Sequence, residues 1–322
     1  MVSVIVLAYN HELWIARALE GVAMQKTNFP IEVLVHDDAS ADKTADIIRA
    51  YEQKYPGLIK PIYQSKNQFS QGNNPFFLLS RKAKGKYLAI CDGDDYWTDP
   101  LKLQKQVALL ESHPECSMAV AKADVYQIKD GQFHYQSTYE GIDKDLVYFD
   151  DLFNGCYFHT STYVIPKINV ISLEKYRGKI FLGDTAIRFI LIDIGPFIFL
   201  RETVSVYQIT GKGMWSLLNS YERAVAHIKL FEGFYAHFKP KYKKYWGTFL
   251  VIYYVIKVFT GIKERKIENL LQNVVRLVYL GLRYTPLVLK LILSRSVRFI
   301  KRKMSNNIYK QYPVNLVKRD GR

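Results

Sequence analysis

The feature that most constrains this chain is an apolar run that ends abruptly in carboxylates. Residues Tyr87–Cys91 are apolar, and Asp92, Asp94 and Asp95 follow within four positions. Carboxylates are rarely buried unless they are paired or hold a metal. A strand that ends in this way presents oxygen ligands at the carboxyl edge of a sheet, where open α/β sheets bind their ligands. Such oxygens suit Mg²⁺ or Mn²⁺, and these ions suit a diphosphate, although a solvated acidic turn has the same pattern.

The first hundred residues alternate between short apolar runs and helical patterns. Continuous β-branched runs predict buried strands at Val2–Leu7, Ile31–Val35 and Ile59–Tyr63. Strands that alternate with helices form a parallel sheet with right-handed crossovers, so we expect an α/β fold. Strand ends at one edge converge in space. The architecture therefore predicts that Tyr9, Asp38 and the acidic residues 92–95 surround one crevice.

The turn after the first strand excludes two common nucleotide-binding folds. The segment Ala8-Tyr9-Asn10-His11 has no glycine-rich fingerprint, which argues against a Rossmann dehydrogenase. No Walker phosphate loop is present either.

Later in the chain, the pattern predicts an edge strand at Leu200–Tyr207.

Cysteine usage and hydropathy indicate the compartment. The odd set of Cys91, Cys116 and Cys156 has no metal-type spacing, so we expect free thiols and a reducing cytosol. The start of the chain lacks the pattern of a signal peptide. We expect no segment long enough for an uninterrupted transmembrane helix, and we interpret 246–262 as a buried hairpin helix.

Charge is distributed unevenly along the chain. Residues 241–322 hold 19 Lys/Arg and 3 Asp/Glu, whereas residues 1–240 hold 26 and 27, so a near-neutral body carries a basic tail. At helical spacing, the basic and apolar residues of 287–303 fall on opposite sectors. Such a helix suits an anionic bilayer surface. We expect membrane association through this tail, and nothing in the chain resembles a nucleic-acid-binding module.

Four ordered motifs give the chain a family resemblance. They are Val-Ser-Val-Ile-Val-x-Ala-Tyr-Asn at 2–10, Asp-Asp-x-Ser-x-Asp-x-Thr at 37–44, Ala-x-Gly-Lys-Tyr at 83–87 and Asp-Gly-Asp-Asp-Tyr-Trp-x-Asp-Pro at 92–100. In this order they resemble the family 2 glycosyltransferases, inverting enzymes of the GT-A fold that use nucleotide-sugar donors. The resemblance is dense over 2–115 and looser to about 220.

The resemblance implies a fold and a domain arrangement. It implies a Rossmann-like mixed sheet flanked by helices over residues 1–220, with nucleotide-sugar binding in 1–115 and the acceptor side in 116–220. Residues 221–322 form a helical, basic region that we expect to associate with membrane.

The resemblance also places donor-binding residues. It assigns Leu7, Ala8 and Tyr9 to the nucleotide base, and Asp38, in preference to Asp37, to a hydrogen bond with that base. Asn73 stands where the family often has a donor-binding Arg, which leaves Lys66 or Arg81 as substitutes. Lys212, between two glycines, is a candidate for closing on the diphosphate.

Asp92-Gly93-Asp94 matches the family's Asp-x-Asp motif. We assign Asp94 to the metal, and Asp92 to the ribose and the metal. Asp95 is a further candidate for a role beside the metal. The ion, Mg²⁺ or Mn²⁺, is expected to stabilise the departing nucleoside diphosphate.

Gly183-Asp184 opens an apolar helix where related enzymes carry their base. An inverting transfer needs one carboxylate to take the proton of the acceptor hydroxyl, and we assign this role to Asp184. Helix capping is an alternative role for the same residue, and one compatible with it. His159 and Trp215 are candidate acceptor contacts.

These assignments predict an inverting, metal-dependent glycosyltransferase at the cytoplasmic face of the inner membrane. The donor is a nucleotide sugar, most simply a UDP-sugar, and the acceptor is a hydroxyl of a glycan or lipid-linked glycan in cell-surface polysaccharide synthesis. Two alternatives stay open on the sequence alone. They are a nucleotidyltransferase, for which the phosphate loop is missing, and a non-catalytic membrane scaffold, against which the intact Asp92, Asp94 and Asp184 argue.

Overall fold

The computed structural model describes residues 1–128, 132–134, 144–181, 183–211, 213–265 and 272–289. Lys212 and the predicted basic sector at 290–303 lie outside these ranges.

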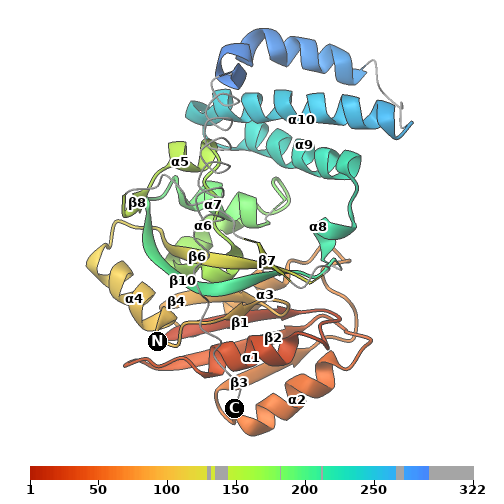
Figure 1. Cartoon of the computed structure of the whole chain (residues 1–322). Coiled ribbons are helices and arrows are strands. Elements are labelled where there is room, and N and C mark those ends of the chain that lie inside the picture. The colour runs from red at the N-terminus through yellow and green to blue at the C-terminus, as the bar shows by residue number, and fades with distance from the viewer. Residues whose placement is uncertain (129–131, 135–143, 182, 212, 266–271, 290–322) are drawn as a thin grey trace, which may run out of the picture.

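A mixed sheet forms the centre of the molecule (Figure 1). Its strands are β1 (Val2–Ala8), β2 (Ile31–Asp37), β3 (Ile59–Tyr63), β4 (Tyr87–Asp92), β5 (Tyr96–Trp97), β6 (Met118–Gln127), β7 (Gln132–His134), β8 (Leu146–Val147), β9 (Val164–Pro166) and β10 (Phe197–Ile209). They are ordered β3-β2-β1-β4-β9-β6-β10-β5, with β7 paired to β6 and β8 to β10. Strands β1 to β4 are parallel, and β9 joins β4 to β6 in antiparallel pairs.

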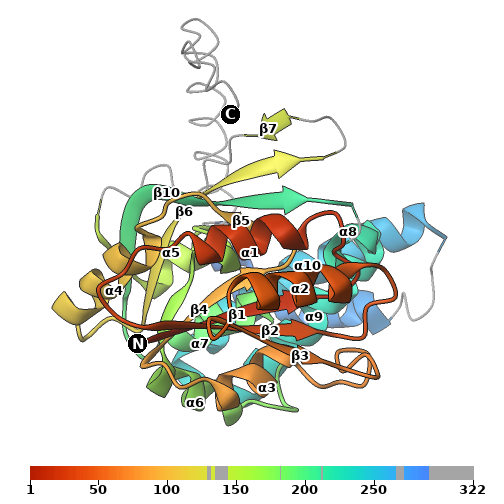
Figure 2. The same ribbon diagram turned by 90° about the horizontal axis from the view of Figure 1, so that it is seen from below.

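Helices cover both faces of the sheet. They are α1 (Ile15–Ala23), α2 (Thr44–Lys54), α3 (Pro75–Lys82), α4 (Lys102–Ser112), α5 (Phe149–Phe153), α6 (Lys167–Glu174), α7 (Asp184–Leu191), α8 (Met214–Leu217), α9 (Ser220–His237) and α10 (Lys243–Lys263), followed by a helix over 272–289. Seen from below, α1 and α2 lie in front of β1 and β2, and α9 and α10 lie behind (Figure 2).

The alternating side chains of β1 explain why helices must cover both faces of the sheet. Val4 and Val6 are buried in the core under α1, α2 and α4, whereas Ile5 is buried in the core on the opposite face. Successive side chains of a strand point to opposite faces, so a strand that is apolar throughout is stable only between two layers. The predicted mixed sheet flanked by helices is confirmed.

The strand that follows α7 differs from the expectation. It is longer than predicted and is not a sheet edge, because β6 pairs with one side of β10 and β5 and β8 pair with the other. The edge prediction over Leu200–Tyr207 is therefore wrong. Ser205 and Val206 pair with β5, a strand of two residues that is too short to be recognised from the sequence pattern.

One helix corrects the expectation about membrane-spanning length. Among the described residues, Pro240–Lys263 is long and apolar enough to cross a membrane by length and composition, and 44% of its most apolar window is buried. The ring centroids of Trp246 and Phe189 are 5.0 Å apart, and those of Phe249 and Phe231 are 4.5 Å apart. These contacts with α7 and α9 bury one face of α10, in agreement with the interpretation of 246–262 as a buried hairpin helix.

Candidate active site

The ends of β1, β2 and β4 meet at one edge of the sheet. In register, Ala8 lies beside Asp37, and Leu7 lies beside Asp92. Beyond the strand ends, Gly93 N donates to Leu7 O at 2.7 Å and Asp38 N donates to Ala8 O at 2.9 Å. The structure therefore brings together Tyr9, Asp38 and the acidic cluster, as the strand topology predicts.

Side-chain hydrogen bonds fasten the loops after β1 and β2 to each other. Asn10 N donates to Ser40 Oγ at 2.9 Å, and Ala41 N donates to Asn10 Oδ1 at 2.9 Å. Asn10 and Ala39 have φ of 55° and 63°, a left-handed conformation that residues other than glycine rarely adopt. Tyr9 precedes this link with 48% of its surface exposed, which leaves its ring free to meet a flat base.

Asp38 is buried and holds a neighbouring loop. Its Oδ1 accepts a hydrogen bond from Gln68 N at 2.6 Å, and its Oδ2 accepts one from Phe69 N at 3.1 Å. His36 Nε2 lies 3.2 Å from Oδ1. The carboxylate thus fixes the loop that carries Asn73, and base binding by Asp38 stays a prediction. Asp37 Oδ1 is buried without a hydrogen-bond partner among the described residues.

The loop after β3 ends in a helix cap. Asn73 Nδ2 donates to Gln68 Oε1 at 3.0 Å, so its amide is part of the loop. Asn74 caps α3 by accepting a hydrogen bond from Phe76 N at 3.0 Å. Arg81, the possible substitute for the missing arginine, forms an ion pair with Glu174 at 3.0 Å.

The three carboxylates after β4 have different surroundings. Asp92 Oδ2 accepts a hydrogen bond from Thr160 Oγ1 at 2.9 Å, and Asp94 Oδ2 lies 4.0 Å from His11 Nε2. Asp95 is 2% exposed, and its Oδ1 accepts a hydrogen bond from Gln208 N at 3.0 Å. Asp92 and Asp94 are partly exposed, whereas Asp95 is buried and the hydrogen bond from Gln208 N joins it to β10.

Burial raises the pKa of all three carboxyl groups, and repulsion by neighbouring carboxylates raises those of Asp92 and Asp95 further. Burial, followed by the charge of Asp94, raises the pKa of Asp92 to about 6, and burial raises the pKa of Asp94 to about 6. Burial and both neighbours raise the pKa of Asp95 well above its usual range. A cation at this edge lowers such repulsion.

Position 93 requires glycine because neighbouring atoms leave no room for a Cβ, and not because of its own backbone conformation. A Cβ at this position meets Leu7 O at 2.9 Å and His11 Nδ1 at 2.7 Å. A larger residue therefore pushes β1 away from the acidic turn and moves Asp92 relative to Asp94.

No group of three or more His, Cys, Asp or Glu side chains is arranged to hold a metal within the described part of the chain. Asp92 and Asp94 nevertheless fit a hard divalent ion, which is commonly held by one or two carboxylates together with phosphate oxygens and water.

A second site element lies at the start of α7. Asp184 Oδ1 accepts a hydrogen bond from Thr185 N at 2.7 Å, and Oδ2 accepts one from Tyr157 OH at 3.0 Å. Arg188 Nη2 lies 3.9 Å from Oδ2, and its guanidinium stacks over the Tyr157 ring at 4.0 Å. The negative charge of Asp184 also raises the pKa of Asp92, so the two carboxylates interact across one site.

Aromatic rings form the wall between these carboxylates. His159 is 4% exposed and stacks on Tyr207 with centroids 4.3 Å apart. Burial, followed by the charge of Arg188, lowers the pKa of His159 to about 4, so its ring is neutral at neutral pH. Burial, followed by the charges of Asp95, Asp94, Asp92 and Asp184, raises the pKa of Tyr207 to about 12.

Several of these residues escaped sequence analysis. Thr160, Tyr157, Tyr207 and Gln208 belong to no motif, and Arg188 lies on the helix that Gly183-Asp184 opens. Arg188 carried the one available signal, because it stands one helical turn after Asp184 on an otherwise apolar helix. The backbone of Trp215 lies in α8, and its side chain, like Lys212, is outside the described residues.

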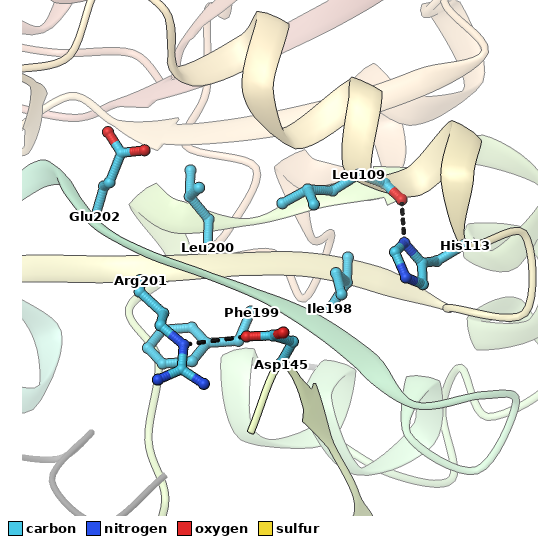
Figure 3. A pocket seen from close by; sticks show the side chains of 8 residues that line it. All are labelled: Leu109, His113, Asp145, Ile198, Phe199, Leu200, Arg201 and Glu202. Carbon is cyan, nitrogen blue, oxygen red and sulfur yellow. Dashed lines mark hydrogen bonds and ion pairs between the residues drawn. The ribbon is translucent and has the colours of Figure 1, made fainter. Parts of the chain in front are cut away.

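A surface hollow of about 320 Å³ lies at the opposite end of β10 from Tyr207 (Figure 3). It is lined by Leu109, His113, Asp145, Ile198, Phe199, Leu200, Arg201 and Glu202. Its polar groups are already paired, since Arg201 Nε donates to Asp145 Oδ1 at 3.0 Å and His113 Nδ1 lies 3.1 Å from Leu109 O. The hollow contains none of the predicted site residues.

Comparison with known proteins places the chain among glycosyltransferases. Residues 3–177 match the family model for glycosyl transferase family 2. An uncharacterized protein of Mycobacterium tuberculosis is 36% identical over 220 residues, which cover 66% of this chain and 60% of that protein. A UDP-Glc:alpha-D-GlcNAc-diphosphoundecaprenol beta-1,3-glucosyltransferase of Escherichia coli is 34% identical over 113 residues, or 35% of this chain and 42% of that protein.

Two solved structures have a similar fold. S. aureus TarS (residues 1–349) in complex with UDP-GlcNAc superposes with a TM-score of 0.56 at 19% identity, covering 88% of this chain and 91% of that one. The mannosyltransferase PcManGT from Pyrobaculum calidifontis, in complex with GDP-Man and Mn²⁺, gives a TM-score of 0.54 at 16% identity, covering 92% and 86%.

Proposed function

The chain belongs to glycosyl transferase family 2 and is a glycosyltransferase with a GT-A fold; from this premise we propose that it transfers a sugar from a nucleotide-diphosphate donor to a hydroxyl with inversion, using Asp184 as the base. The observation that carries the proposal is the gathering of Asp92, Asp94 and Asp184 around Tyr207, whose pKa all three raise. Asp92 and Asp94 follow each other at the end of β4, whereas Asp184 begins α7, so the fold and not a local motif brings Asp184 to the acidic turn.

In the proposed donor site, the base lies between the exposed ring of Tyr9 and the ends of β1 and β2 near Leu7, Ala8 and Asp38. The complexes of TarS with UDP-GlcNAc and of PcManGT with GDP-Man support a nucleotide-sugar donor. We favour UDP as the nucleotide. Lys212 stays a candidate for the diphosphate.

Asp94 and Asp92 would hold the proposed Mg²⁺ or Mn²⁺, and the Mn²⁺ complex of PcManGT supports this choice of ion. The ion would supply positive charge to the departing diphosphate. Thr160 orients Asp92 through its 2.9 Å hydrogen bond. The bond from Gln208 N to Asp95 ties the acidic turn to β10, which we interpret as structural support.

Asp184 is held ready to accept a proton from the acceptor hydroxyl. Tyr157 OH and Thr185 N fix the orientation of its carboxylate, and Nη2 of the buried Arg188 lies 3.9 Å from its Oδ2. Neutral His159 is buried and stacks on the partly exposed Tyr207, so it supports that aromatic ring beside the carboxylates. His159 and Trp215 remain our candidates for acceptor contacts.

We further propose a glycan or lipid-linked acceptor in cell-surface polysaccharide synthesis, at the cytoplasmic face of the membrane. The name of the E. coli relative, which describes transfer to a diphosphoundecaprenol-linked sugar, supports this choice. The chain spans 60% of the length of its M. tuberculosis relative.

A donor screen tests the proposal. Purified full-length chain is incubated with UDP-, GDP- and dTDP-sugars, with Mn²⁺ or with a chelator, and release of nucleoside diphosphate is measured. We expect slow hydrolysis of one donor class that requires the metal and is lost in Asp94→Asn. Asp46→Asn, an exposed α2 carboxylate far from the cluster, is the matched control and should keep wild-type activity. Metal-independent release, or full activity of Asp94→Asn, would contradict the proposal.

A further inference from the structure

The helix over 272–289 is apolar on two opposite sides. Its inner side is buried against α9 and α10 through residues that include Leu280 and Tyr284, which are 5% and 6% exposed. Tyr284 OH lies 3.1 Å from Tyr235 OH, and Arg276 pairs with Glu232 at 3.2 Å, so α9 fixes the orientation of the helix. The helix forms the outermost layer of the molecule on the side away from α1 and α2 (Figure 1).

The outer side of the same helix faces solvent with large apolar side chains. We call this stripe the outer face; it comprises Val275, Val278, Tyr279, Leu282 and Leu289, which are 61%, 55%, 62%, 85% and 56% exposed. Their spacing of three, four and seven residues puts them on one side of a helix. A water-facing helix side is ordinarily polar, and a contiguous exposed apolar surface of this kind marks an interaction site.

The end of α10 extends the apolar surface of this layer. Phe259 and Ile262 are 70% and 54% exposed, and Lys257 Nζ donates to Asn273 Oδ1 at 3.1 Å, so the end of α10 lies beside the start of the 272–289 helix. The layer therefore exposes apolar side chains on two neighbouring helices.

The charges around the outer face are positive. At helical spacing, Arg276 and Arg283 lie along one side of the stripe, Arg276 being paired with Glu232 of α9, and residues 272–289 contain no Asp or Glu. The following 290–322 contain ten Lys/Arg and one Asp, so the sequence that continues from the helix is strongly basic. An apolar stripe with an interfacial tyrosine and flanking cations matches the chemistry of an anionic bilayer surface, where apolar side chains enter the acyl boundary and cations meet the headgroups.

We propose that the outer face docks this enzyme on an anionic lipid bilayer, with the 272–289 helix lying in the plane of the membrane. The buried face of α10 stays packed against α7 and α9, so docking needs no insertion of that helix across the bilayer. The proposal rests on exposed surface and charge, and it stands independently of the catalytic assignment.

Vesicle sedimentation with the full-length chain tests the proposal. The probes are phosphatidylcholine vesicles with and without phosphatidylglycerol. We expect binding to the anionic vesicles, weaker binding to the neutral ones, and an affinity about tenfold lower in the triple variant Val275→Gln, Val278→Gln, Leu282→Gln. The matched control is Ile168→Gln, Ile171→Gln on α6, whose side chains are 70% and 62% exposed, and it should bind like wild type.

Two results would overturn docking through this face. One is unchanged vesicle binding in the triple variant, which would place lipid contact elsewhere, for example in 290–322, or leave the outer face covered by that segment. The other is a wild-type dimer in light scattering that the triple variant dissociates, because a second copy would then occupy the face. Donor hydrolysis in solution, measured on the same preparations, reports folding and tests the catalytic proposal separately.

Discussion

At the scale of single residues, the site concentrates negative charge that the folded chain alone does not neutralise. Asp92, Asp94 and Asp95 are crowded at the end of β4, and the pKa of each is raised. Asp95 is fastened to Gln208 N, and Asp92 to Thr160. Within the described chain, the one ion-pair partner of Asp94 is His11, whose Nε2 lies 4.0 Å from Asp94 Oδ2. Burial lowers the pKa of His11. Such arrangements often reduce stability in exchange for ligand binding.

Replacing Asp94 should therefore stabilise the metal-free protein. Its folded pKa of about 6 lies above that of the unfolded chain, so the folded state binds more protons between about pH 4 and 6 and loses stability as the pH rises through this window. Asp94→Asn removes that penalty and should raise the free energy of unfolding at pH 7.5 by about 1–3 kcal/mol. Urea denaturation without metal measures it.

Mn²⁺ should reverse the order of stability, so that wild type becomes more stable than Asp94→Asn. A ligand that binds only the folded state stabilises it by mass action, so Mn²⁺ should raise the melting temperature of wild type and leave Asp94→Asn unchanged. Asp46→Asn, exposed on α2, should behave as wild type in both conditions. Equal responses of Asp94→Asn and wild type to Mn²⁺ would exclude Asp94 as a ligand.

A buried lysine beneath the site makes a second residue-scale prediction. Lys102 is fully buried, its Nζ lies 4.1 Å from the Trp97 ring centroid, and Nζ has no hydrogen-bond partner among the described residues. Burial lowers the pKa of Lys102 to about 7. Between pH 7 and the ordinary lysine pKa, the unfolded chain therefore binds more protons, and stability falls as the pH is lowered through this window.

Lys102→Met should raise stability at pH 7 by about 1–2 kcal/mol, because methionine fills similar space without a charge to desolvate. The stability of the variant should also vary less between pH 7 and 10 than that of wild type. Melting curves across this range measure both effects, and Lys82→Met on the exposed surface of α3 is the control. A destabilised Lys102→Met with an unchanged pH profile would show that the cation is stabilising where it lies.

At the scale of elements, close backbone contacts position the acidic turn. Gly21 of α1 lies against β5, and a Cβ there would approach Trp97 N at 2.8 Å and Trp97 O at 2.9 Å. Trp97 Nε1 in turn donates to Ser161 O at 2.8 Å, next to the residue that orients Asp92. Helix α1 and strand β5 thus position both the acidic turn after β4 and the segment that contains Thr160.

Gly21→Ala should destabilise the protein by about 1–3 kcal/mol, because the added methyl meets backbone atoms that move only with α1 or β5. The same substitution at Gly281, a helical glycine with open space around its Cβ position, should be neutral or stabilising by up to about 1 kcal/mol. Chemical denaturation compares the two. Equal effects at both positions would mean that helix propensity, and not the contact with Trp97, decides the outcome.

The elements near the start of the chain were the most predictable from sequence. The strands at 2–8, 31–37, 59–63 and 87–92 follow the predicted runs within two residues, because apolar β-branched runs between polar turns have few alternatives. The acceptor side was less predictable. Tyr157, Thr160 and Tyr207 meet because β9 pairs antiparallel with β4 and β10 pairs parallel with β6, and no local pattern encodes such contacts between distant segments.

At the scale of the whole molecule, the C-terminal helices extend the catalytic core. The ring centroid of Trp246 in α10 lies 4.5 Å from that of Phe234 in α9 and 5.0 Å from that of Phe189 in α7. Helix α7 is the helix that begins with Asp184. The aromatic and aliphatic composition of 246–262 indicated a buried helix, and this part was predictable. The exposed outer face of 272–289 was not, because periodicity alone does not distinguish the packed side of a two-sided apolar helix from its open side.

The proposed reaction requires Asp184 to take the proton from the incoming hydroxyl. The most direct measurement compares donor binding and metal-dependent donor hydrolysis in wild type, Asp184→Asn and the control Asp150→Asn, an aspartate in the first turn of α5. We predict that Asp184→Asn binds the donor with wild-type affinity but hydrolyses it about 10²–10⁴-fold more slowly, while Asp150→Asn stays at the wild-type rate. Wild-type turnover by Asp184→Asn would contradict the account.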